Sequence, residues 1–217
     1  MILLIANSKG GVGKTALATS IIAELAKTKA VIGVDLDSVN KSASKEWSAN
    51  RTDEEGKFYY LSGDITDELI RANNEYDEVV IDAGGFDNEE FRRSIAIADA
   101  ILIPVLVGSN SNIIGLQTVA EIIEKIRPDN VPTVYGVATR SPNMGTSPEY
   151  EATINELVND PLITPCSNSI GDRKWYATAF NECKGITEIE PLKRSEKVWI
   201  DKAKTEFLAV FNDIYGE

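Results

Sequence analysis

A glycine-rich segment follows directly after the first apolar run of the chain. The run covers residues 2–6, and the segment reads Lys9-Gly10-Gly11-Val12-Gly13-Lys14-Thr15. A turn of this kind between a buried strand and a helix points several backbone N–H groups into one concavity. The positive end of the helix dipole lies behind that concavity, so it binds phosphate. Lys14 is then placed to reach the β- and γ-phosphates of a nucleotide, and the Thr15 hydroxyl to ligate Mg²⁺.

This segment departs from the plain phosphate-loop pattern G-x-x-x-x-G-K-[ST]. Ser8 stands at the first glycine position, and a second lysine, Lys9, lies five residues before Lys14. Taken alone, Lys9 would be read as a solvated surface lysine. Inside this motif we favour a functional role for it.

Three aspartates close two apolar runs further along the chain. Asp35 and Asp37 follow residues 31–34, and Asp82 follows residues 78–81. A carboxylate at the end of a strand beside a phosphate-binding loop can hold Mg²⁺ directly or through water. Taken alone, Asp35 and Asp37 are each better explained by capping of the next helix. Because all three are expected beside the glycine loop, the metal–phosphate site is the better interpretation.

Short apolar runs alternate with amphipathic segments along the chain, which predicts an α/β fold. The doubly wound, mostly parallel sheet is covered by helices on both faces, and ligands bind at the carboxyl ends of its strands. We expect strands over residues 2–6, 31–34, 58–61, 78–81, 101–107, 131–138 and 162–166. We expect helices over residues 15–28, 41–50, 66–73, 112–126 and 148–158.

Asp87-Asn88-Glu89-Glu90 is typical of a helix-capping box. With no linker or repeat, residues 1–217 are expected to form a single domain.

Composition excludes several classes of function. The 217 residues carry a net charge of −12, and residues 51–100 hold 14 acidic and 5 basic residues, a net of −9. Such acidity disfavours nucleic acids and anionic membranes on average. The absence of histidine excludes histidine-based acid–base catalysis and histidine metal sites. The two cysteines, Cys166 and Cys183, match no metal-site spacing, which indicates a reducing cytoplasm. No apolar run approaches the roughly 20 residues of a membrane span.

Together these residues resemble the deviant Walker-A ATPases of the ParA/MinD superfamily, and within it the ParA branch that partitions plasmids and chromosomes. The deviant loop is present as Lys9–Thr15, the second acidic motif as Asp35-Leu36-Asp37 with Asn40 downstream, and the Walker B aspartate as Asp82. Residues 98–105 resemble the strand after the second switch. The resemblance covers residues 1–140 well and is weaker beyond them.

The resemblance implies a role for each matching residue. Lys14 would bind the phosphates of ATP in its own subunit, and Lys9 would cross a dimer interface to the partner's nucleotide. Thr15 would ligate Mg²⁺, with Asp35 and Asp82 holding its waters, and Asp37 would orient the attacking water. A lysine supplied by a second subunit acts much like an arginine finger, because phosphoryl transfer depends on positioning and charge stabilisation.

Two departures from the family pattern concern the base and the first switch. Relatives often carry Asn-Arg after the sixth strand to read adenine, where this chain has Thr139-Arg140. The usual Asp-Pro-Gln of the second acidic motif is Asp37-Ser38-Val39. The resemblance therefore does not say how this chain would recognise adenine or what geometry its first switch has.

Basic residues gather near the C-terminus of this acidic chain. ParA proteins bind DNA non-specifically through such residues in the ATP-bound dimer, which implies a DNA surface here, each cation supplying a salt-sensitive phosphate contact. The alternative is a solvated helix face, because acidic residues are interspersed. The cluster comprises Arg173, Lys174, Lys193, Arg194, Lys197, Lys202 and Lys204.

The end of the chain argues against a membrane anchor of the MinD type. Residues 207–217 contain no lysine or arginine, so they lack the basic amphipathic character of a membrane helix. One helical stripe is apolar instead, which predicts docking on the domain core. The stripe comprises Trp199, Ala203, Phe207, Val210 and Ile214.

The resemblance therefore implies a cytoplasmic, nucleoid-associated ATP hydrolase that uses ATP and Mg²⁺. It would form an ATP-dependent homodimer and position plasmid or chromosomal DNA. Its hydrolysis would be stimulated by a cargo-bound, ParB-like protein, and it would bind no membrane. The alternatives are a ParA-like positioner of a protein cargo, a MinD-like membrane-associated ATPase, and a metabolic P-loop enzyme in which Lys9 serves the chemistry of one subunit.

Overall fold

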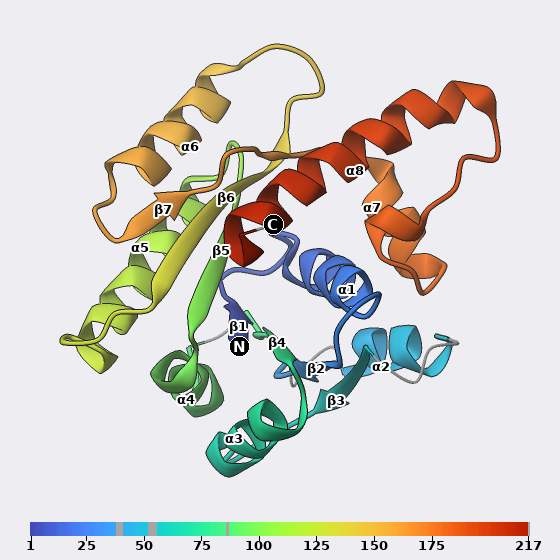
Figure 1. Ribbon diagram of the computed structural model, residues 1–217. Helices are drawn as coiled ribbons and strands as arrows, with labels where there is room; N and C mark the ends of the chain where they lie inside the picture. The colour runs from blue at the N-terminus through green and yellow to red at the C-terminus, as the bar shows by residue number, and fades with distance from the viewer. Residues whose placement is uncertain (38–40, 52–55, 86, 217) are drawn as a thin grey trace.

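A parallel β-sheet forms the centre of the molecule (Figure 1). The structure, a computed structural model, describes residues 1–37, 41–51, 56–85 and 87–216, without the side chains of residues 41–43, 110 and 112. In these residues the eight-stranded sheet has the order β3-β2-β4-β1-β5-β6-β7, and β8 pairs with β6. The strands are β1 (Ile2–Ile5), β2 (Val31–Asp35), β3 (Lys57–Tyr60), β4 (Glu78–Asp82), β5 (Ala100–Leu106), β6 (Thr133–Ser141), β7 (Ile163–Pro165) and β8 (Ile170–Gly171).

Helices cover both faces of this sheet. One face carries α1 (Lys14–Leu25), α2 (Lys41–Ala49), α7 (Lys174–Asn181) and α8 (Arg194–Tyr215), and the other α3 (Thr66–Glu75), α4 (Glu89–Ile97), α5 (Asn110–Ile126) and α6 (Pro148–Asn159). A 3₁₀ turn, Ile186–Glu188, joins the first group. Alternate residues of β1 enter opposite cores, Leu3 and Ile5 on one side and Ile2 and Leu4 on the other. This explains the continuous apolar runs, because a strand covered on both faces has no solvent side.

The predicted doubly wound α/β architecture is confirmed, and the predicted strands and helices have bounds that differ by three residues at most. The capping prediction is wrong in its detail. Asn88, and not Asp87, caps α4, because its side chain accepts a hydrogen bond from the backbone N–H of Phe91 at 2.8 Å. Asp87 pairs instead with Arg92.

The C-terminal helix α8 packs on the core along the predicted stripe, with one correction. Ala203, Phe207, Val210 and Ile214 are buried, whereas Trp199 is 45% exposed. Its neighbour Ile200 is buried in its place, three residues before Ala203 and seven before Phe207, a spacing that keeps it on the same helical stripe. None of the helices in the described residues has the length and apolar character to cross a membrane.

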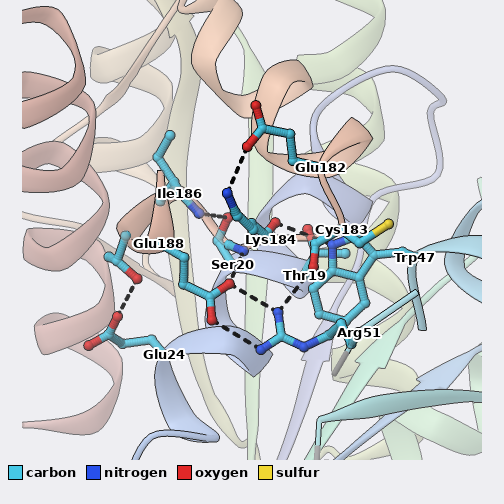
Figure 2. Close-up of polar contacts among 12 residues, drawn as sticks. Thr19, Ser20, Glu24, Trp47, Arg51, Glu182, Cys183, Lys184, Ile186 and Glu188 are labelled. Carbon is cyan, nitrogen blue, oxygen red and sulfur yellow. Dashed lines mark hydrogen bonds and ion pairs between the residues drawn. The ribbon is translucent and has the colours of Figure 1, made fainter. Parts of the chain in front are cut away.

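A buried polar cluster ties α1 and α2 to the segment after α7 (Figure 2). Arg51, just beyond α2, donates from two nitrogens to both carboxylate oxygens of Glu188, at 3.0 and 3.1 Å. Its guanidinium lies 4.7 Å from the ring centre of Trp47, whose indole N–H donates to the Lys184 carbonyl at 3.2 Å. Glu188 also accepts from the backbone N–H of Gly185. The cluster therefore anchors α2, which begins close after the aspartates of β2.

The Arg51→Met substitution tests this anchor. The Arg51 side chain is only 3% exposed, so its loss leaves Glu188, at 24% exposure, without its cation. We expect the free energy of unfolding to fall by about 3 kcal/mol in urea denaturation, the lower end for a broken buried pair. Lys184→Met is the control, because it breaks an ion pair with Glu182 whose side chains are 43% and 47% exposed. That change should cost under about 1 kcal/mol; equal losses in the two variants would contradict a special role for Arg51.

Candidate functional site: a phosphate-binding loop with strand-end carboxylates

The glycine loop connects β1 to α1 and presents its backbone to an open space. Gly13 precedes the first turn of α1 with φ of 98°, and Gly11 has φ of 76°. Residues that carry a side chain rarely adopt this left-handed backbone conformation. A residue other than glycine at either position would therefore strain the loop. A Cβ atom added at Gly10, Gly11 or Gly13 would meet nothing within 4 Å. The loop thus has room for a ligand beside its N–H groups, as the sequence predicts.

Lys14 lies folded over this loop and is buried. Its ammonium donates to the carbonyls of Lys9 at 2.8 Å and of Asn7 at 3.3 Å. Burial lowers the pKa of Lys14, whereas the nearby carboxylates of Asp82 and Asp37 raise it. The ammonium is therefore held beside the space above the loop, where the phosphates of a nucleotide are expected.

Asp82 lies at the end of β4 next to Thr15. The Thr15 hydroxyl donates to one carboxylate oxygen, Oδ2, at 2.6 Å. The other oxygen, Oδ1, is buried and has no hydrogen-bond partner among the described residues. Burial raises the pKa of Asp82 to about 7. A buried acceptor without a donor is costly, so this oxygen fits a site that a cation or its bound water completes.

Asp35 lies beside Asp82, because the two residues are register partners in the β2–β4 ladder. Its carboxylate accepts from the Ser44 hydroxyl of α2 and from the backbone N–H of Asp37, the latter at 2.8 Å. Burial raises the pKa of Asp35. Asp37 is half-buried at the same edge. Ser38, Val39 and Asn40 lie outside the described residues.

The residues present fit Mg²⁺ held jointly with a nucleotide. Among the described residues, no group of three or more His, Cys, Asp or Glu side chains could hold a metal ion by itself. Mg²⁺ is usually bound by one or two carboxylates together with waters and the phosphates of a substrate. Thr15, Asp82 and Asp35 offer such a partial set of oxygen ligands.

Asn7 is part of the site and was not found by sequence reasoning. It is fully buried, its side-chain amide donates to the Pro104 carbonyl at 2.9 Å, and its Oδ1 accepts from the backbone N–H of Lys9 at 2.9 Å. It thereby fixes the start of the loop to β5. Its only signal in the sequence is a polar residue at the end of an apolar run. The Lys9 side chain is half-buried at the mouth of the loop.

Gly115 of α5 makes room for this arrangement, which leads to a prediction. A Cβ atom there would lie 2.5 Å from Asn7 Oδ1 and 3.1 Å from Lys9 Cγ. If the loop holds the phosphates of a nucleotide, as the sequence predicts, Gly115→Ala should weaken the binding of a fluorescent ATP analogue by about tenfold, a shift of about 1.4 kcal/mol. Alanine is a better helix former by about 1 kcal/mol, so a loss would come from the displaced loop. Gln117→Ala on an exposed position of the same helix is the control; unchanged binding in Gly115→Ala would contradict the steric account.

A cleft of about 800 Å³ extends from the glycine loop towards α7. Thr139 lies on its wall, and its hydroxyl donates to the Val12 carbonyl at 2.9 Å. Arg140, Asp172 and Arg173 line the cleft beyond it. The cleft therefore has space for a nucleoside next to the phosphate loop, and Thr139 supports the loop from the cleft wall.

Arg173 does not belong to the predicted DNA surface. It is only 8% exposed, and its guanidinium pairs with Glu206 of α8. Lys193, Arg194 and Lys197 are exposed at the start of α8, as that prediction requires. The first turns of α8 and the residues just before it also expose apolar side chains, so this end combines cations with an apolar surface. The apolar side chains are Leu192 (92% exposed), before the helix, and Val198 (69%) and Trp199 (45%), within it.

Comparisons with known proteins agree with this geometry. Residues 3–181 match the family described as the CobQ/CobB/MinD/ParA nucleotide binding domain. Similar solved structures include a variant of McdA from Cyanothece in complex with ATP, with 16% identity and a TM-score of 0.71, covering 99% of this chain and 96% of that one. MinD from Aquifex aeolicus has 20% identity and a TM-score of 0.70, covering 100% and 97%. A plasmid partition protein from Borrelia burgdorferi bound to AMPPNP has 16% identity and a TM-score of 0.64, covering 98% of each chain.

No curated protein matches the chain in sequence. At these identities the solved structures establish the fold, and the family match covers most of the chain. The glycine loop, the strand-end carboxylates and the parallel sheet are the features through which this fold binds nucleotides. The chain belongs to the CobQ/CobB/MinD/ParA family of nucleotide-binding domains and has the ParA/MinD P-loop fold.

Proposed function

We propose that the protein is a Mg²⁺-dependent ATPase of the ParA type that forms a dimer around ATP. The observation that carries the proposal is the pairing of two lysines in one phosphate loop, Lys9 at its mouth and Lys14 folded inside it. One lysine suffices for binding phosphates within a subunit. A second cation at the rim serves best where another nucleotide approaches, which is the geometry of a symmetric dimer.

Within one subunit the proposed roles follow the described contacts. Lys14 exchanges its two carbonyl partners for phosphate oxygens, which present full negative charge to the ammonium. Thr15, Asp82 and Asp35 would hold Mg²⁺, directly or through water, and the bound ion would supply positive charge to the phosphates. Asp37 orients the attacking water from the same edge. This division of labour suits phosphoryl transfer, where catalysis is mostly positioning and charge stabilisation.

Lys9 acts on the partner's nucleotide in this proposal. Both of its described polar contacts use the backbone, the N–H to Asn7 and the carbonyl from Lys14. Its ammonium makes no ion pair within the described part of the chain. The cation is therefore available to stabilise charge on a phosphate that a second subunit brings to it.

The cargo surface is proposed at the start of α8. Lys193, Arg194 and Lys197 would contact DNA phosphates, and a dimer would present two such clusters. These exposed cations support non-specific DNA binding in the ATP state. The protein would then act at the nucleoid in the cytoplasm, and a cargo-bound, ParB-like protein would stimulate its hydrolysis of ATP. A positioner of a protein cargo is the second candidate, favoured by the exposed apolar side chains of Leu192, Val198 and Trp199 at the same place.

DNA retention measured against salt concentration separates the two candidates. For a DNA-binding dimer, retention should require Mg²⁺ and ATP, be absent with ADP, and fall with salt. The triple variant Lys193→Ala/Arg194→Ala/Lys197→Ala should flatten the slope of log K against log salt by about two to three units for each of the two clusters of the dimer that contacts the DNA. The control is Lys57→Ala/Arg71→Ala/Lys125→Ala, which removes the same charge elsewhere. Equal retention in the two triple variants would refute DNA binding at α8 and favour the protein cargo.

A further inference from the structure

Part of the wall of the cleft is formed by the short segment that links β8 to α7. Gly171, Asp172 and Arg173 line the cleft there, next to residues of α7 that also line it. Strand β8 has only two residues, so little of this wall is held by the sheet itself. Its position must be fixed by other contacts if it is to meet the nucleoside part of a nucleotide.

One carboxylate from α8 supplies those contacts. Glu206 accepts from the backbone N–H of Gly171 at 3.2 Å and from Nε of Arg173 at 2.6 Å, and its other oxygen accepts from Nη2 of the same arginine. Arg173 Nη1 donates to the Asn143 side chain at 3.1 Å. Arg173 and Glu206 are both only 8% exposed. A bidentate ion pair between arginine and a carboxylate is strong and has a defined geometry.

Gly171 shows how closely the wall is packed onto this pair. A Cβ atom at that position would lie 2.9 Å from two nitrogens of the Arg173 guanidinium. The backbone of the wall therefore rests directly on the ion pair. A shift of the guanidinium moves the residues that face the cleft.

We propose that Glu206 is a positioning residue for nucleotide binding, which acts through Arg173 and Gly171 to set the wall that meets the nucleoside. This inference rests on the proposed function, because it assigns this part of the same cleft to the base and ribose of ATP. The described hydrogen bonds of the Glu206 carboxylate are all with Gly171 and Arg173 and none with the glycine loop, so we expect its effect to fall on the nucleoside.

Two probes distinguish this role from a general loss of structure. ATP carries a nucleoside, whereas inorganic tripolyphosphate carries only the phosphates that the glycine loop binds. In calorimetric titrations with Mg²⁺, we expect Glu206→Gln to weaken ATP binding about ten- to a hundredfold and to leave tripolyphosphate binding within about twofold of wild type. In steady-state assays KM for ATP rises while kcat stays close to wild type. Glu190→Gln is the control. It removes the exposed carboxylate that pairs with Lys204, a lysine on α8 two residues before Glu206.

A second variant covers the case in which Glu206→Gln leaves too unstable a fold. Arg173→Met/Glu206→Met removes both charges, and apolar replacement of a buried pair is often tolerated. It should show the same selective loss of ATP affinity. Equal weakening of ATP and tripolyphosphate, or unchanged ATP binding, would overturn the role of Glu206. If the wild-type protein binds neither probe, the proposed function itself fails; wild-type binding of both with no selective loss defeats this inference alone.

Discussion

Lys14→Ala should abolish ATP hydrolysis, with kcat/KM reduced by about 10³-fold or more, the upper range for removing one preorganised charge-stabilising donor. The Lys14 ammonium is buried inside the loop, held by two backbone carbonyls and faced by Asp82 and Asp37. No neighbouring cation in the described residues donates to the same carbonyls. Alanine therefore leaves the phosphates without the positive charge that this loop supplies. A coupled assay of phosphate release measures the effect.

Folding is not expected to be the cause of that loss. A buried lysine carries a desolvation cost, shown by its lowered pKa, so its removal should leave the stability of the ligand-free protein unchanged or raise it. Lys27→Ala is the matched control, because Lys27 follows the same helix and makes an exposed ion pair with Glu24. Hydrolysis by Lys14→Ala within tenfold of wild type would show that phosphate binding does not use this lysine.

Asp82→Asn should have opposite effects on activity and on stability. Mg²⁺-dependent hydrolysis should fall by about 10²-fold or more, because the amide removes a negative charge at the metal site. The metal-free protein should become more stable, since Asp82 is fully buried and one of its oxygens has no partner in the described residues. Asparagine keeps an acceptor for the Thr15 hydroxyl. We expect the thermal midpoint to rise by several degrees, as about 1 kcal/mol moves it by about 2–4 °C in a domain of this size.

The stability gain should depend on pH in a defined direction. Burial raises the pKa of Asp82 from 3.8 to about 7, so between these values the folded metal-free protein holds a proton that the unfolded chain has lost. Raising the pH through this window therefore destabilises the wild-type protein through Asp82. The advantage of Asp82→Asn should be absent near pH 4, grow up to about pH 7 and stay constant above it. Urea denaturation in EDTA at several pH values measures this, and an advantage that shrinks with rising pH would contradict the account.

The local part of the site was predictable because its pattern is local. The strand, the glycine turn and the helix of residues 2–25 are contiguous, and the aspartates mark the carboxyl ends of their own strands. In a parallel sheet covered by helices, those ends meet at one edge whatever the details of the fold. The loop, Asp35 and Asp82 therefore came together as the sequence indicated.

The parts that escaped prediction depend on distant partners. Gly115 and Asn7 meet across α5 and β1, and Glu206 reaches Arg173 over 33 positions in the chain. The sequence predicts Arg173 to be a surface cation, because no residue near it in the chain indicates that it pairs with the buried carboxylate of Glu206. The prediction that Trp199 lies on the buried stripe is wrong by one residue, because Ile200 is buried instead. Helical periodicity alone does not distinguish these two neighbours.

The central claim is that ATP joins two subunits and that Lys9 of one subunit reaches the nucleotide of the other. Light scattering with the Mg²⁺ complex of AMPPNP, which avoids hydrolysis, tests it most directly, with ADP and nucleotide-free samples as references. Because the polar contacts of Lys9 in the loop use its backbone, Lys9→Ala should keep nucleotide affinity within the monomer. We predict twice the monomer mass for the wild type with AMPPNP only, and the monomer mass for Lys9→Ala in every state. A wild-type protein that stays monomeric with AMPPNP, or a Lys9→Ala variant that dimerises as well as wild type, would contradict it.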